Sequence, residues 1–173
     1  MSLPAKIEIA SNIATIGAAV LLSAVLVKVY LVPGQRTTAP TRPAAEAAVG
    51  TNLKSQIPGV DWSKNGRTLV LAMSTTCHFC KDSEPFYRRI RQEVGAGVKM
   101  IAVLPQPQAD AEEYLNTAGV KVDEVRQLAL TAIGVRGTPT MLLVDGKGVV
   151  TKVWVGKLQG QEEEQVLSVL KKG

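Results

Sequence analysis

The sequence predicts an α/β fold in which helices cover both faces of a central mixed sheet, preceded by an N-terminal transmembrane helix. Short apolar runs alternate with amphipathic segments after residue 50, which is typical of parallel βαβ units. Two later apolar runs flank an Asp-Gly turn, which predicts an antiparallel hairpin. A long apolar stretch over residues 9–32 predicts the membrane helix.

The apolar stretch has the length of a membrane-spanning helix. Its core, Ile13–Val27, contains no charged residue. Over residues 9–32 a helix would be about 36 Å long at ~1.5 Å per residue, enough for a hydrocarbon core of ~30 Å. A cleaved signal peptide is the alternative, but its cleavage site should follow closely, and the best candidate, residues 45–47, lies well beyond the stretch. We predict an uncleaved anchor over residues 1–32.

Residues 33–50 separate the anchor from the rest of the chain. Their prolines, alanines and polar side chains bury little apolar surface. We therefore predict a semi-extended Pro/Ala-rich linker over residues 33–50. A length of 173 residues allows one ordinary domain besides such an appendage, and we place that domain over residues 51–173.

Composition limits the partners that the chain can have. Aromatic residues make up 4% of it, which argues against the stacking surfaces of single-stranded nucleic-acid binders. The net charge is +5, but basic and acidic side chains are interspersed, and the tightest basic cluster, Arg88-Arg89-Arg91, falls on one predicted helix. We expect no nucleic-acid partner.

The first half of the domain predicts two strands joined by a helix. The wholly apolar run Leu69–Met73 is typical of a strand buried on both faces. A helix should begin near Cys77, after three hydroxyl residues, and end before Gly95. Its buried face is marked by side chains that recur every three or four residues: Phe79, Ser83, Phe86, Ile90 and Val94. Val98–Leu104 predicts the second strand.

The second half predicts helices, a hairpin and a last helix. Helices are expected over Ala109–Thr117 and Glu124–Ile133, with a short extended piece at Val120–Val122 between them. The hairpin strands are Thr140–Val144 and Val149–Val155, and the final amphipathic helix is Gln159–Lys171, with acids early and lysines late as the helix dipole favours. Parallel crossovers therefore come first and the hairpin last.

Both cysteines of the chain lie in one window, Cys77-His78-Phe79-Cys80, where a strand leads into a helix. Unpaired backbone N–H groups at a helix start favour a thiolate over a thiol, so Cys77 should be the exposed nucleophile. Cys80 follows one turn later on the same face, close enough to attack a mixed disulfide and release the substrate thiol. This spacing predicts a reversible dithiol in which Cys80 is the less exposed partner.

Other uses of these cysteines fit the sequence less well. A structural zinc ion normally takes four ligands, and only Cys77, His78 and Cys80 are close in sequence, so we expect no metal site. A c-type haem motif would need histidine directly after Cys80, where Lys81 stands. Two inert core cysteines are the plain alternative, but a helix start with a hydroxyl-rich lead-in argues against them. We expect no cofactor.

Three local features resemble the thioredoxin superfamily, and more narrowly its membrane-anchored bacterial thiol–disulfide oxidoreductases. They occur in the family's order: the Cys77–Cys80 motif, Pro85, and residues 134–140 (GVRGTPT) followed by MLLVDGKG. The resemblance covers roughly residues 51–173 and implies a thioredoxin-like fold there. Pro85 matches the proline that kinks the family's active-site helix, and a break that ends a short first helix is the alternative.

The resemblance also implies roles for two residues outside the motif. Pro139 would follow a cis peptide bond with Thr138 and lie beside Cys77. The Thr138 backbone would then pair, strand-like, with the peptide that carries the target disulfide. An ordinary loop proline before a strand is the alternative.

Two departures from the family concern the environment of the cysteines. Thr76 replaces the tryptophan that commonly precedes the first cysteine, and Leu71 stands where thioredoxin itself carries a buried acid. The Cys80 proton must then go to water or another group. His78 could supply a hydrogen bond or positive charge that lowers the Cys77 pKa and makes the disulfide more oxidising; a solvent-exposed histidine without influence is the alternative.

We expect a thiol:disulfide oxidoreductase in which Cys77 and Cys80 exchange disulfides, His78 tunes the potential, and Thr138 and Pro139 position the substrate. Its partners would be a protein (or small-molecule) disulfide or dithiol substrate, a redox partner protein and, through the N-terminal helix, the membrane. A peroxiredoxin-like peroxidase, with Ser74 at the place of that family's threonine, is one alternative. A Cu(I) or haem-maturation chaperone that uses the same cysteines is another.

Two arguments about the side of the membrane disagree. The basic residues that follow the uncharged core Ile13–Val27, namely Lys28, Arg36 and Arg42, favour a cytoplasmic domain by the positive-inside rule. A signal anchor on a small redox domain usually serves export. We expect a single-pass protein with an extracytoplasmic, periplasmic catalytic domain.

Overall fold

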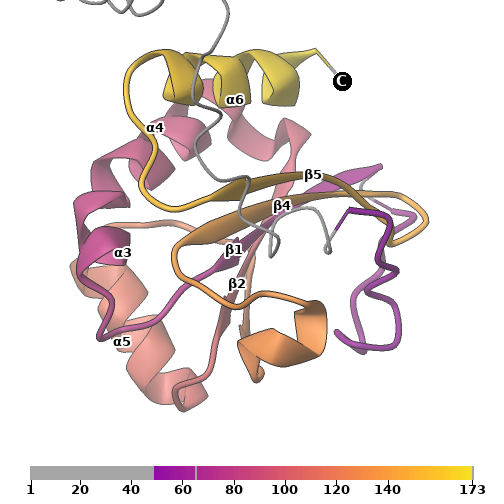
Figure 1. The fold of residues 1–173 in the computed structure, drawn as a ribbon, viewed down its shortest axis with the longest axis horizontal. Coiled ribbons are helices and arrows are strands. Elements are labelled where there is room, and N and C mark those ends of the chain that lie inside the picture. The colour runs from indigo at the N-terminus through magenta and orange to yellow at the C-terminus, as the bar shows by residue number, and fades with distance from the viewer. Residues whose placement is uncertain (1–48, 65, 173) are drawn as a thin grey trace, which may run out of the picture. The chain divides into compact units, whose positions relative to one another are not determined.

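The computed structural model describes residues 49–64 and 66–172 (Figure 1). The predicted anchor over residues 1–32 and all but the last two residues of the predicted linker lie outside this part. None of the helices in the described part is long and apolar enough to cross a membrane.

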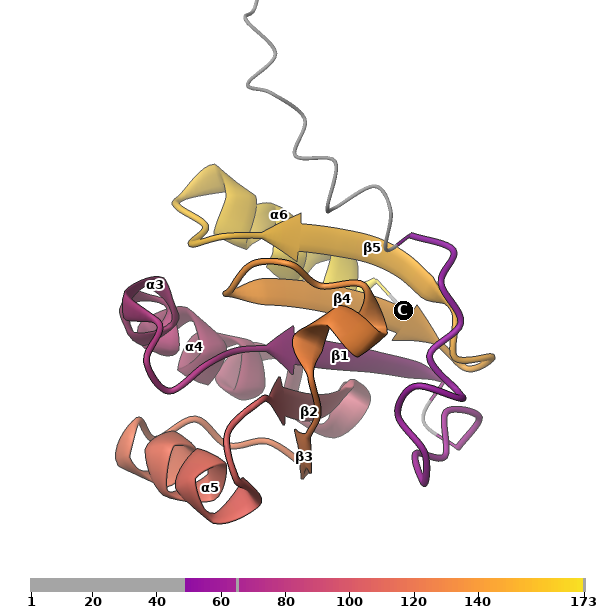
Figure 2. The same cartoon turned by 60° about the horizontal axis from the view of Figure 1, so that its bottom comes forward.

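Five strands form one mixed sheet in the order β3-β2-β1-β4-β5 (Figures 1 and 2). β1 pairs in parallel with β2, and β2 with β3, whereas β4 runs antiparallel to both β1 and β5. Parallel crossovers come first and the hairpin last, so the prediction of a mixed sheet is confirmed. The strands are β1 Arg67–Ala72, β2 Lys99–Leu104, β3 Glu124–Gln127, β4 Thr140–Asp145 and β5 Val150–Val155.

The central strands are buried on both faces because each one divides its apolar side chains between two clusters. In β1, Leu69 and Leu71 lie in one cluster and Val70 and Ala72 in the other, as the two-residue period of a strand requires. The cluster of Leu69 and Leu71 also contains residues of α4 (Glu84–Val94), α5 (Gln108–Thr117) and α6 (Gln161–Lys171), and we call it the helical cluster.

The α-helices of the described residues do not cover both faces as predicted, because α4, α5 and α6 all contribute to the same cluster. Right-handed crossovers from β1 to β2 and from β2 to β3 step in one direction, so both helices must lie on one face. The other face is covered by side chains between Leu53 and Trp62 and by the 3-10 helix η3, Leu130–Ile133.

The helix predicted from Cys77 to Val94 is two helices, α3 (His78–Asp82) and α4, separated at Ser83. Pro85 lies in the first turn of α4, where it has no N–H to donate to the carbonyl of Lys81. The structure thus shows the second of the two alternatives for Pro85. The break also changes the buried face, because Phe79 is 57% exposed and does not join Phe86 and Ile90 in the core.

The prediction is wrong for residues 120–133. The strand there is β3, four residues later than the extended piece expected at Val120–Val122, and the helix expected over Glu124–Ile133 is replaced by β3 and the short η3. Hydrogen bonds to β2 outweigh the local helix preference: Asp123 N–H donates to the Met100 carbonyl at 2.8 Å, and its carboxylate accepts from Met100 N–H at 2.7 Å.

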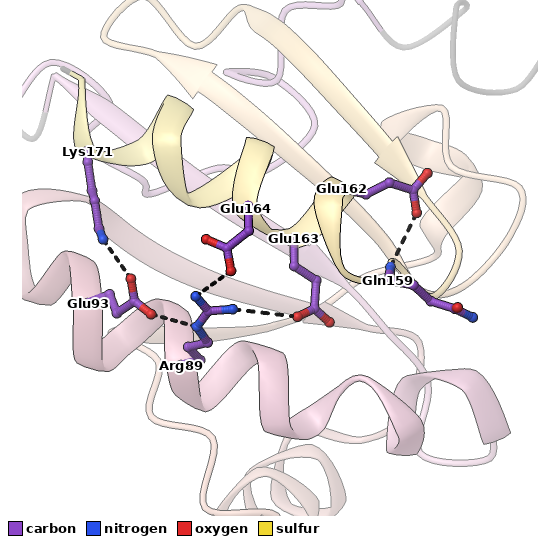
Figure 3. A network of polar contacts seen from close by, with 7 residues as sticks. All are labelled: Arg89, Glu93, Gln159, Glu162, Glu163, Glu164 and Lys171. Atoms are coloured by element: carbon purple, nitrogen blue, oxygen red, sulfur yellow. Dashed lines mark hydrogen bonds and ion pairs between the residues drawn. The ribbon is translucent and has the colours of Figure 1, made fainter.

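An ion-pair network joins α4 to α6 (Figure 3). Arg89 donates to Glu93 and to Glu164, each at 2.6 Å, and Lys171 donates to Glu93 at 2.6 Å. The hydrogen bonds from Lys171 and then Arg89 hold the pKa of Glu93 below its ordinary value.

The lowered Glu93 pKa predicts a pH-dependent contribution to stability. A carboxyl whose pKa is lower in the folded chain stabilises it above the unfolded-state pKa, and this contribution disappears as the pH falls through the folded-state pKa. Glu93→Gln should therefore melt below wild type at pH 7, with the difference closing below about pH 4. Thermal melts of both chains between pH 7 and 3 check this. Glu113→Gln, at an exposed position on α5, should show no such closing gap.

Arg67 connects the start of β1 to the end of α6. Its guanidinium donates to the carbonyls of Val169 at 3.1 Å and Leu170 at 2.9 Å, which a helix C-terminus leaves unpaired. Arg67→Ala should lower the free energy of unfolding by about 1–3 kcal/mol, the usual worth of hydrogen bonds to a charged group. Denaturant titration measures this, and an equal loss in Arg136→Ala, at an exposed arginine, would contradict the capping explanation.

Candidate active site

Cys77 lies in the connection between β1 and α3. After Ala72 the chain makes a turn in which Cys77 N–H donates to the Ser74 carbonyl at 3.1 Å. Cys77 then has extended backbone angles, φ −86° and ψ 112°, and is the N-cap residue of α3. The first predicted site residue is therefore at the helix start, as the hydroxyl-rich lead-in indicated.

The two cysteines form a disulfide, with their Cα atoms 5.2 Å apart, inside the usual range for such a bond. Cys77 is half-buried, whereas Cys80 is 0% exposed and lies in the helical cluster. Cys80 N–H is shared between the Cys77 sulfur and the Cys77 carbonyl oxygen, each 3.1 Å away, so this sulfur takes the place of an N-cap side-chain oxygen. Only Cys77 is open to an approaching substrate.

The helix start acts on Cys77 through near neighbours. α3 contains five residues, so its macrodipole is small, and the directed Cys80 N–H is the group that would stabilise a Cys77 thiolate. The same N–H would remain within α3 when the disulfide is reduced, because it belongs to the helix backbone. The stabilisation of a Cys77 thiolate by the start of α3 thus depends mainly on the hydrogen bond from Cys80 N–H.

Charged side chains gather on the exposed side of α3. His78 Nε2 lies 3.7 Å from the Asp82 carboxylate, and the Lys157 ammonium donates to the same oxygen at 3.0 Å. The Lys157 hydrogen bond holds the pKa of Asp82 below its ordinary value. The sequence marked His78 but gave no sign of Lys157, which lies 75 positions after Asp82 and is brought there by the end of β5.

Thr138 and Pro139 lie at the same end of the sheet as Cys77. Thr140, the first residue of β4, is paired with Ala72, the last residue of β1. The peptide bond between Thr138 and Pro139 is cis. Pro139 is buried and its carbonyl accepts from Gly156 N–H at 2.7 Å, whereas no hydrogen bond among the described residues uses the Thr138 backbone.

The position that holds a buried acid in thioredoxin is apolar here. Leu71 is 0% exposed and packs in the same cluster as Cys80. Among the described residues the buried polar side chains are Thr68, Ser83 and Thr140, none of them a carboxylate. The described part of the chain also contains no cluster of three His, Cys, Asp or Glu side chains that could hold a metal ion.

A cysteine pair at a helix start, carried by a mixed sheet of this strand order, defines a thioredoxin-fold protein with a redox-capable dithiol. The chain belongs to the thioredoxin-like domain family, whose model matches residues 62–171. The resemblance of the sequence motifs to the thioredoxin superfamily is thereby confirmed.

Solved structures share this fold. A thiol-disulfide isomerase from Corynebacterium glutamicum is 16% identical, with a TM-score of 0.54 over 72% of this chain and 93% of its own. The thioredoxin domain of a thiol-disulfide oxidoreductase from Bacteroides vulgatus is 17% identical, with a TM-score of 0.52 over 69% of this chain and 89% of its own. A candidate thiol:disulfide interchange protein DsbE from Chlorobium tepidum is 22% identical, with a TM-score of 0.52 over 64% and 83%. No curated protein matches the chain.

Proposed function

We propose that the chain is a thiol:disulfide oxidoreductase that acts on protein disulfides through Cys77 and Cys80. The observation that carries the proposal is the asymmetry of the pair: a half-buried sulfur that accepts a backbone hydrogen bond, joined to a sulfur with no exposure. The names of the structural neighbours, thiol-disulfide isomerase, oxidoreductase and interchange protein, support the same chemistry.

In the reducing direction the Cys77 thiolate attacks one sulfur of the substrate disulfide. The substrate S–S bond breaks, a Cys77–substrate disulfide forms, and the other substrate sulfur leaves as a thiolate that takes up a proton. Cys80 then loses its proton and attacks the Cys77 sulfur, which releases the second substrate thiol. Starting from the Cys77 thiolate and the Cys80 thiol, the chain gives up two electrons and one proton and ends as the Cys77–Cys80 disulfide, while the second proton that the substrate thiols need comes from water. The oxidising direction is the reverse.

The proton of Cys80 must leave the helical cluster during this second step. Leu71 cannot accept it, and the buried polar side chains of the described residues include no carboxylate. We therefore assign the proton to water that enters as Cys77 becomes bonded to substrate.

The Thr138 backbone is proposed to position the substrate. Thr138 lies two residues before Thr140, which pairs with the end of β1, and its N–H and C=O are unused by hydrogen bonds within the described residues. A peptide that pairs with them would lie as an added strand beside the disulfide. Pro139, which is buried, would hold Thr138 in place.

The partners and the location are proposed from the same chemistry. A dithiol enzyme needs a second redox protein to restore it and requires no cofactor. The apolar stretch at residues 9–32 supports a single-pass anchor, which would raise the local concentration of the domain near membrane-bound partners. An extracytoplasmic, periplasmic position suits a partner that carries disulfides.

Two measurements test the proposed function. Insulin reduction by the full chain, with dithiothreitol as electron source, should be well above the uncatalysed rate. Equilibration with glutathione buffers of graded ratio should then give a reduction potential that fixes the physiological direction. Peroxide consumption without a disulfide substrate, or stoichiometric Cu(I) binding without any disulfide exchange, would replace the proposal by one of its alternatives.

His78 is proposed to tune the potential through its position one residue after Cys77. Its side chain is 80% exposed, so solvent screens any charge on it and the effect should be small. His78→Ala should make the disulfide less oxidising, by about 2- to 5-fold in the equilibrium constant with glutathione. Phe79→Ala, which removes an exposed uncharged neighbour, is the control; equal shifts in both variants would leave His78 with no electrostatic role.

A further inference from the structure

The turn that leads into Cys77 is held by a side chain from a distant part of the sequence. Gln106, in the loop between β2 and α5, donates from Nε2 to the Ser74 hydroxyl oxygen at 2.8 Å. Its Oε1 accepts from the Thr75 backbone N–H at 3.4 Å. One amide group thus bonds to two successive residues of the turn.

The other hydrogen bonds that Ser74 makes to described residues lie within the turn itself. The Ser74 hydroxyl lies 3.1 Å from that of Thr76 and accepts from Thr76 N–H at 3.4 Å, while the Ser74 carbonyl accepts from Cys77 N–H at 3.1 Å. Among the described residues, Gln106 is the one side chain outside residues 74–77 that hydrogen-bonds to Ser74 or Thr75. Gln106 is thus the side chain that ties Ser74 and Thr75 to the loop after β2.

Gln106 stands on a stiff piece of backbone. Pro105 and Pro107 flank it, each with its φ fixed by the ring, and a residue before proline is restricted to extended conformations. Pro107 is also the N-cap residue of α5, and its carbonyl accepts from Ala111 N–H at 3.0 Å. Gln106 is half-buried between these two exposed prolines. The backbone of Gln106 therefore loses little conformational entropy when the amide bonds to the turn, and the remaining entropic cost is that of ordering the side chain.

We propose that Gln106 is a positioning residue for Cys77. By holding Ser74 and Thr75, it fixes where the chain enters α3 and so keeps the Cys77 sulfur at the Cys80 N–H, 3.1 Å away. A turn released from Gln106 lets this sulfur move off its donor, which weakens the stabilisation of the Cys77 thiolate. The inference rests on the proposed thiol–disulfide exchange, to which it adds a residue whose hydrogen bonds go to Ser74 and Thr75 and to neither cysteine.

The test compares variants of the full chain in the reduced state. Gln106→Ala should slow alkylation of Cys77 by iodoacetamide at neutral pH by about 2- to 10-fold, the worth of one hydrogen bond. The apparent pKa in the pH profile of alkylation should rise, and insulin reduction should slow by a similar factor. Gln108→Ala is the matched control, because Gln108 is exposed and its amide bonds to Glu112 at 2.8 Å.

A second variant separates positioning from general stability. Ser74→Ala removes the hydroxyl that Gln106 holds, so it should slow alkylation in the same way, and the double variant should be no slower than the more affected single one. If Gln106→Ala lowers the melting temperature but leaves the pH profile of Cys77 at wild type, or if the two substitutions act additively, the proposal is overturned. If the wild-type chain shows no disulfide exchange, the proposed function is overturned instead. The alkylation profiles would still decide the role of Gln106.

Discussion

Cys77→Ser should abolish insulin reduction, and Cys80→Ser should convert the chain into a trap for its substrates. The difference follows from the exposure of the two sulfurs, since Cys77 is half-buried and Cys80 is 0% exposed. Without Cys77 no sulfur can reach a substrate disulfide. Without Cys80 the first attack still occurs, but nothing resolves the mixed disulfide. Non-reducing electrophoresis of each variant mixed with a disulfide-bonded protein should show the covalent complex for Cys80→Ser alone.

Two controls accompany this pair of variants. Dithiothreitol should dissociate the complex, because its two chains are joined by a disulfide. The double variant Cys77→Ser/Cys80→Ser should form none. A stable complex with Cys77→Ser and none with Cys80→Ser would reverse the two roles and contradict the assignment of Cys77 as nucleophile.

In the reduced wild-type chain, Cys77 should react with iodoacetamide at neutral pH at least about 100-fold faster than Cys80. A thiolate that accepts the Cys80 N–H at a half-buried position is both more abundant and easier to reach than a thiol inside an apolar cluster. Brief alkylation followed by peptide mass spectrometry gives the two rates.

The same alkylation of the unfolded chain in denaturant gives the reference rates, because unfolding exposes both cysteines to solvent equally. Rates within a few-fold of each other are expected under those conditions. Equal rates in the folded chain as well, or a faster Cys80, would show that burial and the hydrogen bond do not distinguish the two sulfurs.

The sequence predicted those parts of the fold that depend on short-range pattern. The strands of the central sheet were found because wholly apolar runs such as Leu69–Met73 have few other uses, and the hairpin because Asp145 precedes glycine. β3 was missed because Glu124–Gln127 has helical composition and becomes a strand only through its pairing with β2. Pairing of residues far apart in sequence leaves no local signal.

In the candidate site, too, the residues that are close in sequence could be predicted and those that come from distant segments could not. Cys77, Cys80 and His78 lie in one window, and their spacing carries their chemistry. Lys157 and Gln106 reach α3 and its lead-in only because the sheet places the ends of β5 and β2 beside it. In the sequence, Gln106 stands between two prolines just after the strand predicted at Val98–Leu104. A glutamine between two prolines does not by itself predict a contact with the turn before Cys77, and only the folded structure shows that contact.

The two residues between the cysteines both project into solvent: the His78 side chain is 80% exposed and Phe79 is 57% exposed. The dipeptide therefore contributes almost nothing to the interior, and evolution can exchange either residue without repairing the core around it. A small library confined to positions 78 and 79 should for that reason give folded proteins throughout, with reduction potentials that differ only by the small amounts that solvent-screened charges allow. The surface beside the disulfide can therefore change independently of the stability of the domain.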